Sequence, residues 1–140
     1  MKKMDNVFIK KNVEYNEFAL AILADKSIGV KTPKIISYNE GNKTLIISKL
    51  NYSNVADYFG EEDEKTPDYI YSKIRKIVKK LYNGGIMYPD ITGYNFLIDK
   101  NENIWIIDFG HAYVKSPDEP DDPFVFEFIN GKNGWNPNYK

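Results

Sequence analysis

Short runs of β-branched and aromatic residues near the beginning of the chain predict a small antiparallel sheet. The run 7–10 predicts a strand, whose period of two places Phe8 and Lys10 on one face. The runs 34–38 and 44–50 are separated by a polar loop that contains a glycine, as is typical of a hairpin. The first 50 residues therefore predict at least three antiparallel strands.

Two longer segments have the composition and spacing of helices. Residues 14–26 are dense in helix formers, and the apolar run in their middle predicts a largely buried helix that ends near Gly29. Residues 70–81 carry isoleucine, valine and leucine at helical spacing, ahead of two consecutive glycines. Thr66 and Pro67 predict the cap and the first turn of this second helix.

The segments around the second helix are polar. Residues 51–60 predict one short helix, and the acidic run 61–64 predicts a solvated connector. We interpret the basic residues of the second helix as a solvated face rather than a phosphate-binding patch. These residues are Lys73, Arg75, Lys76, Lys79 and Lys80.

A second hairpin and an irregular region complete the pattern. Residues 95–99 and 104–108 are short apolar runs joined by a polar loop, which predicts a hairpin. Residues 116–123 are rich in proline and acid and predict irregular backbone. The three phenylalanines of 124–129 fit either a short helix or a strand, so both remain open.

Composition favours one soluble globular domain. The chain has 140 residues, of which 42% are hydrophobic and 28% charged, enough for one core and too polar for a membrane span. Its 19 basic and 20 acidic residues give a net charge of -1, which argues against nonspecific binding to nucleic acid or membranes. The absence of cysteine excludes disulfides and thiolate chemistry. We identify no targeting segment and expect a cytoplasmic protein.

Three polar residues stand where apolar segments end: Asp90, Asn95 and Asp108. The ends of strands are where binding and catalytic sites tend to be built. Phosphoryl transfer from a nucleotide needs a carboxylate near the attacking hydroxyl and hard oxygen ligands for Mg²⁺. These three residues can supply that set.

The residues around these positions resemble protein kinases. Residues 88–95, Tyr-Pro-Asp-Ile-Thr-Gly-Tyr-Asn, are similar to the kinase catalytic loop, and 108–110 match the D-F-G triplet. Asn95 lies five residues after Asp90 and the triplet begins thirteen residues after Asn95, both as in that family. The small hydroxyl of Thr92 resembles atypical kinases, namely the RIO kinases and the kinase of the KEOPS complex. A loop of this kind also occurs in aminoglycoside phosphotransferases.

The resemblance implies a role for each motif residue. Asp90 would be the catalytic base that accepts the proton of the substrate hydroxyl. Asn95 and Asp108 would be the metal ligands and, with Asp90, the catalytic residues. Lys10 is similar to the lysine of the V-A-I-K strand that contacts the α- and β-phosphates, and Glu17 to its helical partner.

The same resemblance predicts how the nucleotide is bound. Glu17 is preferred to Glu14 as the partner of the lysine because its distance from the helix stop suits the family better. Phe8 stands where the family prefers an alanine facing adenine, so it either stacks on the base or obstructs it. Residues from Ile47 to Leu50 would be the hinge that presents backbone groups to adenine.

The implied fold is α+β: a minimal protein-kinase-like bilobal fold with a reduced N-lobe sheet and a truncated helical C-lobe. We expect a single domain over 1–140, with the N-lobe at about 1–50, the C-lobe at about 51–115 and an aromatic C-terminal tail at 116–140. Only nine residues precede Lys10, so we expect the glycine-rich loop over the phosphates to be missing. About thirty residues follow the D-F-G triplet, without an A-P-E triplet, so we expect little of the peptide-binding platform.

The resemblance implies ATP and Mg²⁺ as cofactors. It favours transfer of the γ-phosphate to a hydroxyl on a protein, as in an atypical serine/threonine kinase. The alternative is a catalytically inactive pseudokinase or scaffold that binds a partner protein, with or without nucleotide. A small-molecule kinase is harder to reconcile with the short C-terminal region.

Further expectations concern regulation, the role of His111 and assembly with a partner. Tyr88 and Pro89 replace the His and Arg of the family motif, so we expect no switching by a phosphorylated activation loop. His111 has no carboxylate or serine partner at a recognisable spacing, and we interpret it as a packing residue. We expect a second copy or another protein to complete the site, with a homodimer formed through the aromatic tail.

Overall fold

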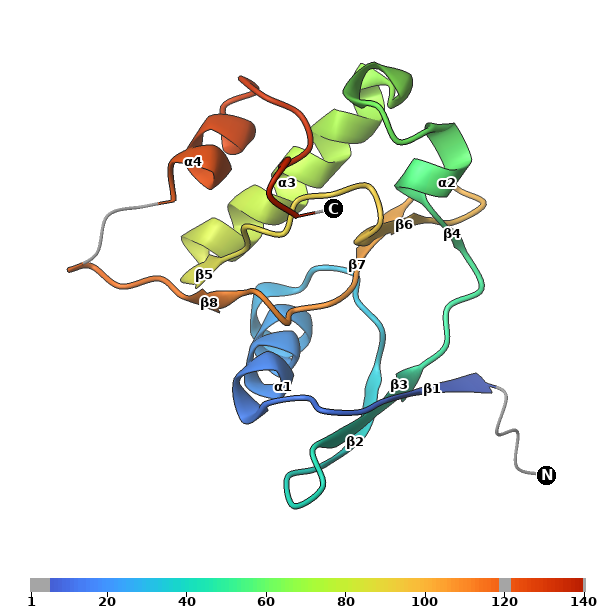
Figure 1. Ribbon diagram of the computed structural model, residues 1–140, viewed down its shortest axis with the longest axis vertical. Helices are drawn as coiled ribbons and strands as arrows, with labels where there is room; N and C mark the ends of the chain where they lie inside the picture. The colour runs from blue at the N-terminus through green and yellow to red at the C-terminus, as the bar shows by residue number, and fades with distance from the viewer. Residues whose placement is uncertain (1–5, 119–121, 140) are drawn as a thin grey trace.

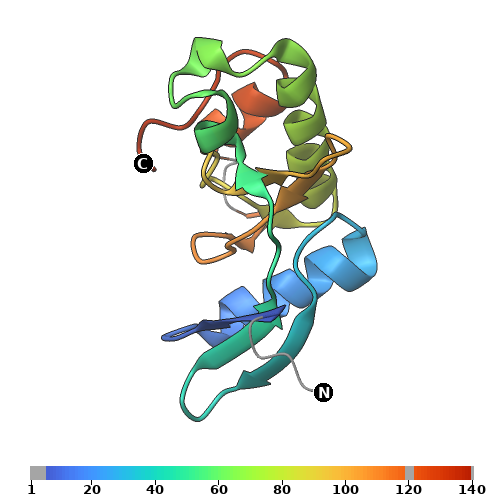
Figure 2. The same ribbon diagram turned by 90° about the vertical axis from the view of Figure 1, so that its right-hand side faces the viewer.

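The computed structural model describes residues 6–118 and 122–139, which form two lobes (Figure 1). Figure 2 shows a small lobe with one sheet and one long helical segment beside a larger lobe that holds the other helices. Residues 119–121, within the segment predicted to be irregular, lie outside the described residues. In the described ranges, every helix is too short or too polar to cross a lipid bilayer.

The sheet of the small lobe forms from the predicted strands. β1 (Val7–Lys10) and β2 (Ile35–Asn39) each pair antiparallel with the central strand β3 (Thr44–Ser48). The pairing register places Phe8 opposite Ile47 and Lys10 opposite Leu45. The predicted N-terminal sheet and hairpin are therefore confirmed.

The helix of the small lobe packs into the core of the large lobe. α1 (Tyr15–Ile22) continues through a π-helical segment, η2 (Leu23–Ile28), to Gly29, whose φ of 82° favours glycine. Leu20 and Ala24 are buried in the same apolar cluster as the core residues of the large lobe. One hydrophobic core therefore serves both lobes.

The described residues of the large lobe form three helices, a short 3₁₀ turn and two small sheets. The helical elements are α2 (Val55–Phe59), η3 (Asp63–Lys65), α3 (Asp68–Asn83) and α4 (Pro123–Ile129). The strands are β4 (Ser53–Asn54), β5 (Ile86–Met87), β6 (Phe96–Ile98), β7 (Ile104–Ile106) and β8 (Tyr113–Val114). One sheet has the order β4-β6-β7, and the other pairs β5 with β8.

The apolar periodicity of α3 corresponds to the face that it buries. Ile70, Ile74, Val78 and Leu81 are at most 1% exposed. They belong to the same cluster as Phe96 and other buried residues of the β6-β7 hairpin. Burial of an aliphatic side chain of this size contributes about 1.5–3 kcal/mol, so this stripe orients the helix against the sheet.

The N-terminal caps of α4 and α3 settle one open prediction and correct another. The open segment 124–129 is helical because the Asp122 carboxylate accepts the N–H of Phe124 at 2.9 Å and so caps α4. The prediction that Thr66 caps α3 is wrong. The cap position is Pro67, whose carbonyl oxygen accepts the N–H of Ile70 at 3.0 Å, and Thr66 is buried instead.

Arg75 is not part of a solvated face, which corrects the interpretation of the basic residues of α3. Its guanidinium donates to the carbonyl oxygens of Phe128 at 2.8 Å and Asn133 at 2.6 Å. The same group lies over the rings of Tyr71 and Phe128, 5.1 and 4.7 Å from their centroids. Arg75 therefore joins α3 to α4 and to the chain that follows it.

Replacing Arg75 with alanine is expected to lower the free energy of unfolding by about 2–3 kcal/mol, because two charge-assisted hydrogen bonds and the ring contacts are lost together. Urea denaturation of the variant and the parent measures this loss. Lys76→Ala is the matched control, since Lys76 is the next residue of α3 and is exposed. Equal losses in the two variants would contradict the assignment.

Candidate active site

The β6-β7 hairpin brings Asn95 and Asp108 to one end of the sheet. Phe96 pairs with Ile106, so the residue before β6 and the residues after β7 leave the hairpin on the same side. The Ile107 N–H donates to the Asn95 carbonyl at 3.0 Å and extends the pairing by one step. The amide and the carboxylate therefore come together through local chain geometry.

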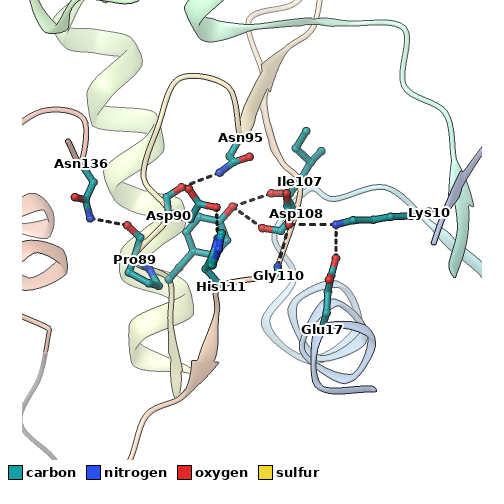
Figure 3. A network of polar contacts seen from close by, with 11 residues as sticks. Lys10, Glu17, Pro89, Asp90, Asn95, Ile107, Asp108, Gly110, His111 and Asn136 are labelled. Carbon is teal, nitrogen blue, oxygen red and sulfur yellow. Dashed lines mark hydrogen bonds and ion pairs between the residues drawn. The ribbon is translucent and has the colours of Figure 1, made fainter. Parts of the chain in front are cut away.

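The β5-β8 pair brings Asp90 and His111 together. Met87 pairs with Tyr113, so the loop that follows β5 runs beside the loop that precedes β8. Oδ2 of Asp90 lies 2.9 Å from Nδ1 of His111 (Figure 3). The interpretation of His111 as a packing residue without a carboxylate partner is wrong, because strand pairing supplies that partner across 21 positions.

Tyr88 fixes the backbone of the D-F-G segment. Its hydroxyl lies 2.7 Å from the Ile107 carbonyl oxygen and 2.8 Å from that of Asp108, and its single proton is shared between them. Its ring packs edge-on against Phe109, with centroids 5.6 Å apart. Asp108 has φ of 65°, a left-handed conformation that a non-glycine residue adopts only when its surroundings enforce it.

Burial keeps the Tyr88 hydroxyl protonated. The residue is 1% exposed, and this burial, together with the negative charges of Asp90 and Asp108, raises the pKa of its hydroxyl well above 10.0. A phenol that keeps its proton remains a donor over the whole physiological range. The backbone of Asp108 is therefore held by a contact that does not change with pH in that range.

The Lys10 ammonium connects the small lobe to the D-F-G segment. It donates to Oε2 of Glu17 at 2.5 Å and to Oδ1 of Asp108 at 3.2 Å (Figure 3). Lys10 comes from β1 and Glu17 from α1, so three separate segments meet at this point. Gly110 lies against these carboxylates, because a Cβ added at this position would be 3.0 Å from the Asp108 carboxylate and 3.4 Å from that of Glu17.

The charge of Lys10 is stabilised by its partners. Partial burial acts to lower the pKa of the ammonium, but the hydrogen bond to Glu17 and the negative charges of Asp108 and Glu17 outweigh it, so the pKa is raised. Because the folded pKa lies above the ordinary 10.5, this contribution to stability is present below that pH. It is lost as the pH rises through the raised pKa.

The oxygen atoms of Asn95 and Asp108 suit a hard divalent cation. Nδ2 of Asn95 donates to the Asp90 carbonyl at 3.0 Å, which leaves its amide oxygen on the other side of the group (Figure 3). Oδ1 of Asp108 accepts from Lys10 and from the Gly110 N–H, the latter at 2.9 Å. Among the described residues no group of three His, Asp or Glu side chains could hold a metal ion.

The residues predicted to contact adenine lie on and after the small-lobe sheet. Phe8 shares the face of β1 that carries Lys10 and is 51% exposed. Ile47 lines a cavity of about 40 Å³ with Lys10 and Asp108. Leu50 follows β3, at the start of the segment that runs to the large lobe. The sheet face therefore adjoins the polar cluster, although this cavity holds only about one water molecule.

Sequence reasoning missed three contributors to this site. His111 contacts Asp90, Tyr88 holds the Asp108 backbone, and Asn136 donates to the carbonyl oxygen of Pro89 at 2.8 Å. Tyr88 carried one usable signal, because it replaces the histidine of a recognised motif. The contact of Asn136 spans 47 positions and has no signature in the local pattern.

Comparison with known proteins agrees with the predicted resemblance. Residues 2–127 match the family model of the RIO domain. A probable bifunctional tRNA threonylcarbamoyladenosine biosynthesis protein of Methanocaldococcus jannaschii is 33% identical over 67% of this chain and 16% of its own length. A 3-deoxy-D-manno-octulosonic acid kinase of Vibrio cholerae is 33% identical over 41% of this chain and 24% of its own length. The chain thus spans a quarter or less of these relatives.

Solved structures show the same fold. The kinase PK-1 of Cydia pomonella granulovirus superposes with a TM-score of 0.58 and 19% identity, covering 77% of this chain and 42% of its own. WbdD superposes with a TM-score of 0.59 and 22% identity, covering 84% of this chain and 27% of its own. The predicted reduced bilobal fold is therefore confirmed.

Replacing Tyr88 with phenylalanine is expected to lower the free energy of unfolding by about 1–3 kcal/mol, because two buried carbonyl oxygens lose their donor. Chemical denaturation measures the difference from the parent. In the control Tyr58→Phe the lost hydroxyl belongs to a residue that is 58% exposed, and a change below about 0.5 kcal/mol is expected. A neutral Tyr88→Phe variant would refute the role assigned to this hydroxyl.

Replacing Glu17 with glutamine is expected to lower the pKa of Lys10, because the largest stabilising contact of its ammonium loses its charge. NMR titration of the lysine side-chain carbons measures this value. The matched control is Glu14→Gln, since Glu14 pairs with Lys43 at 2.9 Å and raises the pKa of that lysine. The control should lower the pKa of Lys43 and leave that of Lys10 unchanged. A Lys10 pKa that Glu17→Gln leaves unchanged would disprove the pairing.

Proposed function

Because this chain belongs to the RIO domain family, we propose that it is an ATP-dependent phosphotransferase that transfers the γ-phosphate to a hydroxyl on a protein. The observation that carries this proposal is the contact of Lys10 with both Glu17 and Asp108. These residues come from the small-lobe strand, the small-lobe helix and the D-F-G segment. A cation fixed at this junction suits the phosphates of a nucleotide bound between the lobes.

Each polar residue has a place in the proposed reaction. Asp90 accepts the proton of the attacking hydroxyl. Asn95 and Asp108 hold Mg²⁺, which neutralises charge on the phosphates when it is bound. Lys10 orients the α- and β-phosphates, and Glu17 orients Lys10.

Adenine is proposed to lie against the face of the small-lobe sheet. Phe8 provides an exposed ring on the strand that carries Lys10, and Ile47 an apolar side chain on the neighbouring strand. Leu50 belongs to the connecting segment whose backbone groups would meet the base edge. The acceptor would approach from the side of the catalytic loop, where a cavity of about 510 Å³ is lined by Thr92, Gly93 and the acidic residues 61–63.

One observation favours the alternative of a nucleotide-binding scaffold without transfer. Oδ2 of Asp90 is engaged by His111 at 2.9 Å, and Asp90 is only 6% exposed. A carboxylate with an occupied oxygen presents less to an incoming hydroxyl. The two functions share the nucleotide site and differ only in turnover, so one experiment separates them.

Calorimetric titration with ATP and Mg²⁺ is expected to show binding by the parent chain, and at least a tenfold loss of affinity in Asp108→Asn because a metal ligand is weakened. Asp90→Asn should bind ATP as the parent does but lose at least 100-fold in release or transfer of radiolabelled phosphate. Asp118→Asn, an exposed aspartate outside the site, is the control.

The outcomes separate the alternatives. If the parent binds no nucleotide, the phosphotransferase proposal fails. If it binds nucleotide in an Asp108-dependent manner but transfers no phosphate to water, protein or sugar-acid acceptors, the scaffold function stands instead.

A further inference from the structure

We propose that residues 134–139, here called the C-terminal strap, position the candidate base, and that Asn136 is the positioning residue. This inference deepens the proposed function and rests on it. The strap lies in the part of the chain that the sequence indicated only as an aromatic tail. No residue of the strap belongs to the motifs by which the site was identified.

Asn136 binds the catalytic loop on both sides of Asp90. Its backbone N–H donates to the Ile91 carbonyl oxygen at 2.8 Å, and its Nδ2 donates to the Pro89 carbonyl oxygen at 2.8 Å (Figure 3). The side chain is buried, with 3% of the residue exposed. One asparagine therefore binds the carbonyl oxygens of the residues immediately before and after Asp90.

The Asp90 carbonyl oxygen, which lies between those of Pro89 and Ile91 in the sequence, also accepts hydrogen bonds. The Asp90 carbonyl oxygen accepts Nδ2 of Asn95 at 3.0 Å and the N–H of Thr92 at 3.1 Å. Each of the three consecutive carbonyl oxygens, from Pro89 to Ile91, thus has a defined donor. These contacts constrain the backbone of Asp90, and the contact with His111 constrains its carboxylate.

The strap is itself well anchored. The backbone N–H of Trp135 donates to Oδ1 of Asp63 at 3.2 Å, and the Trp135 ring packs on Tyr71 with centroids 4.8 Å apart. Oδ1 of Asn136 accepts the N–H of Asn138 at 3.1 Å, which fixes the amide so that Nδ2 faces the loop. The acidic run predicted to be a solvated connector therefore supplies one anchor, through Asp63.

The strap also approaches the Asp90 carboxylate through His111. The Tyr139 ring lies edge-on to the His111 ring, with centroids 5.1 Å apart. His111 in turn contacts Oδ2 of Asp90 at 2.9 Å. Because the strap acts on both the backbone and the side chain of Asp90, displacing it should misplace the base without removing any group from the nucleotide site.

The strap is therefore expected to affect turnover and not nucleotide affinity. Asn136→Ala should lower kcat for phosphate release from MgATP by about 10- to 100-fold, since a small misplacement of a catalytic group has an effect of this size. The Kd for MgATP, measured by calorimetry, should stay within about twofold of the parent, because Lys10, Asn95 and Asp108 are untouched. Asn101→Ala, an exposed asparagine in the β6-β7 turn, is the matched control and should change neither value.

Hydrogen exchange provides a readout that is independent of activity. The amides of Ile91 and Thr92 donate within the catalytic loop, to the carbonyl oxygens of Pro89 and Asp90. They should exchange at least tenfold faster in Asn136→Ala, while those of α3 keep their rates. If the parent transfers no phosphate to any of the acceptors named above, the proposed function fails by itself, and this measurement still decides whether the strap positions the loop.

Two results would overturn the inference. The first is a kcat and exchange rates that Asn136→Ala leaves unchanged. The second is an equal loss of kcat, nucleotide affinity and α3 protection, because that pattern indicates general destabilisation. Should Asn136→Ala not fold, Tyr139→Ala removes only the ring contact with His111 at the end of the strap. It is then expected to lower kcat about threefold or more at constant Kd, and no change in kcat would count against the strap.

Discussion

Antiparallel pairing of short strands is the constraint on which this structure depends. The strands of the β5-β8 pair and the β6-β7 hairpin contain only ten residues in total. Their pairing nevertheless determines where the loops that follow β5 and β7 and that precede β6 and β8 lie. The D-F-G segment joins the two pairs, because it leaves β7 and enters β8. Its conformation is therefore fixed at both ends, and the buried Tyr88 hydroxyl fixes it in the middle.

Electrostatics adds a second level of organisation. The carboxylates of Glu17 and Asp108 both contact the single Lys10 ammonium, and the Asp90 carboxylate pairs with His111, so carboxylates outnumber the ammonium where phosphates are proposed to bind. A triphosphate can enter such a site only together with counter-charge, which is why a divalent cation is part of the proposal. The single ammonium is placed where it contacts carboxylates from two different segments.

Local patterns predicted the helices and strands well, since the causes of these elements are local. The hairpin that carries Asn95 and Asp108 follows from two β-rich runs and a polar loop, and the pairing of those runs brings the two residues together. The buried face of α3 follows from its period. The contacts of Arg75 could not be predicted, because its side chain looks like those of the neighbouring lysines and its partners lie 53 and 58 positions away. The same holds for Asn136, whose partner is a backbone carbonyl.

The common core of the two lobes has a mechanical consequence. α1 is anchored by Leu20 and Ala24 in the cluster that also contains the large-lobe residues, and the Ile106 N–H donates to the Lys31 carbonyl just beyond that helix. Glu17 therefore lies on a helix that is anchored in the large-lobe core, whereas Lys10 lies on a strand of the small-lobe sheet. The salt bridge between them ties the edge strand of that sheet to the core that both lobes share.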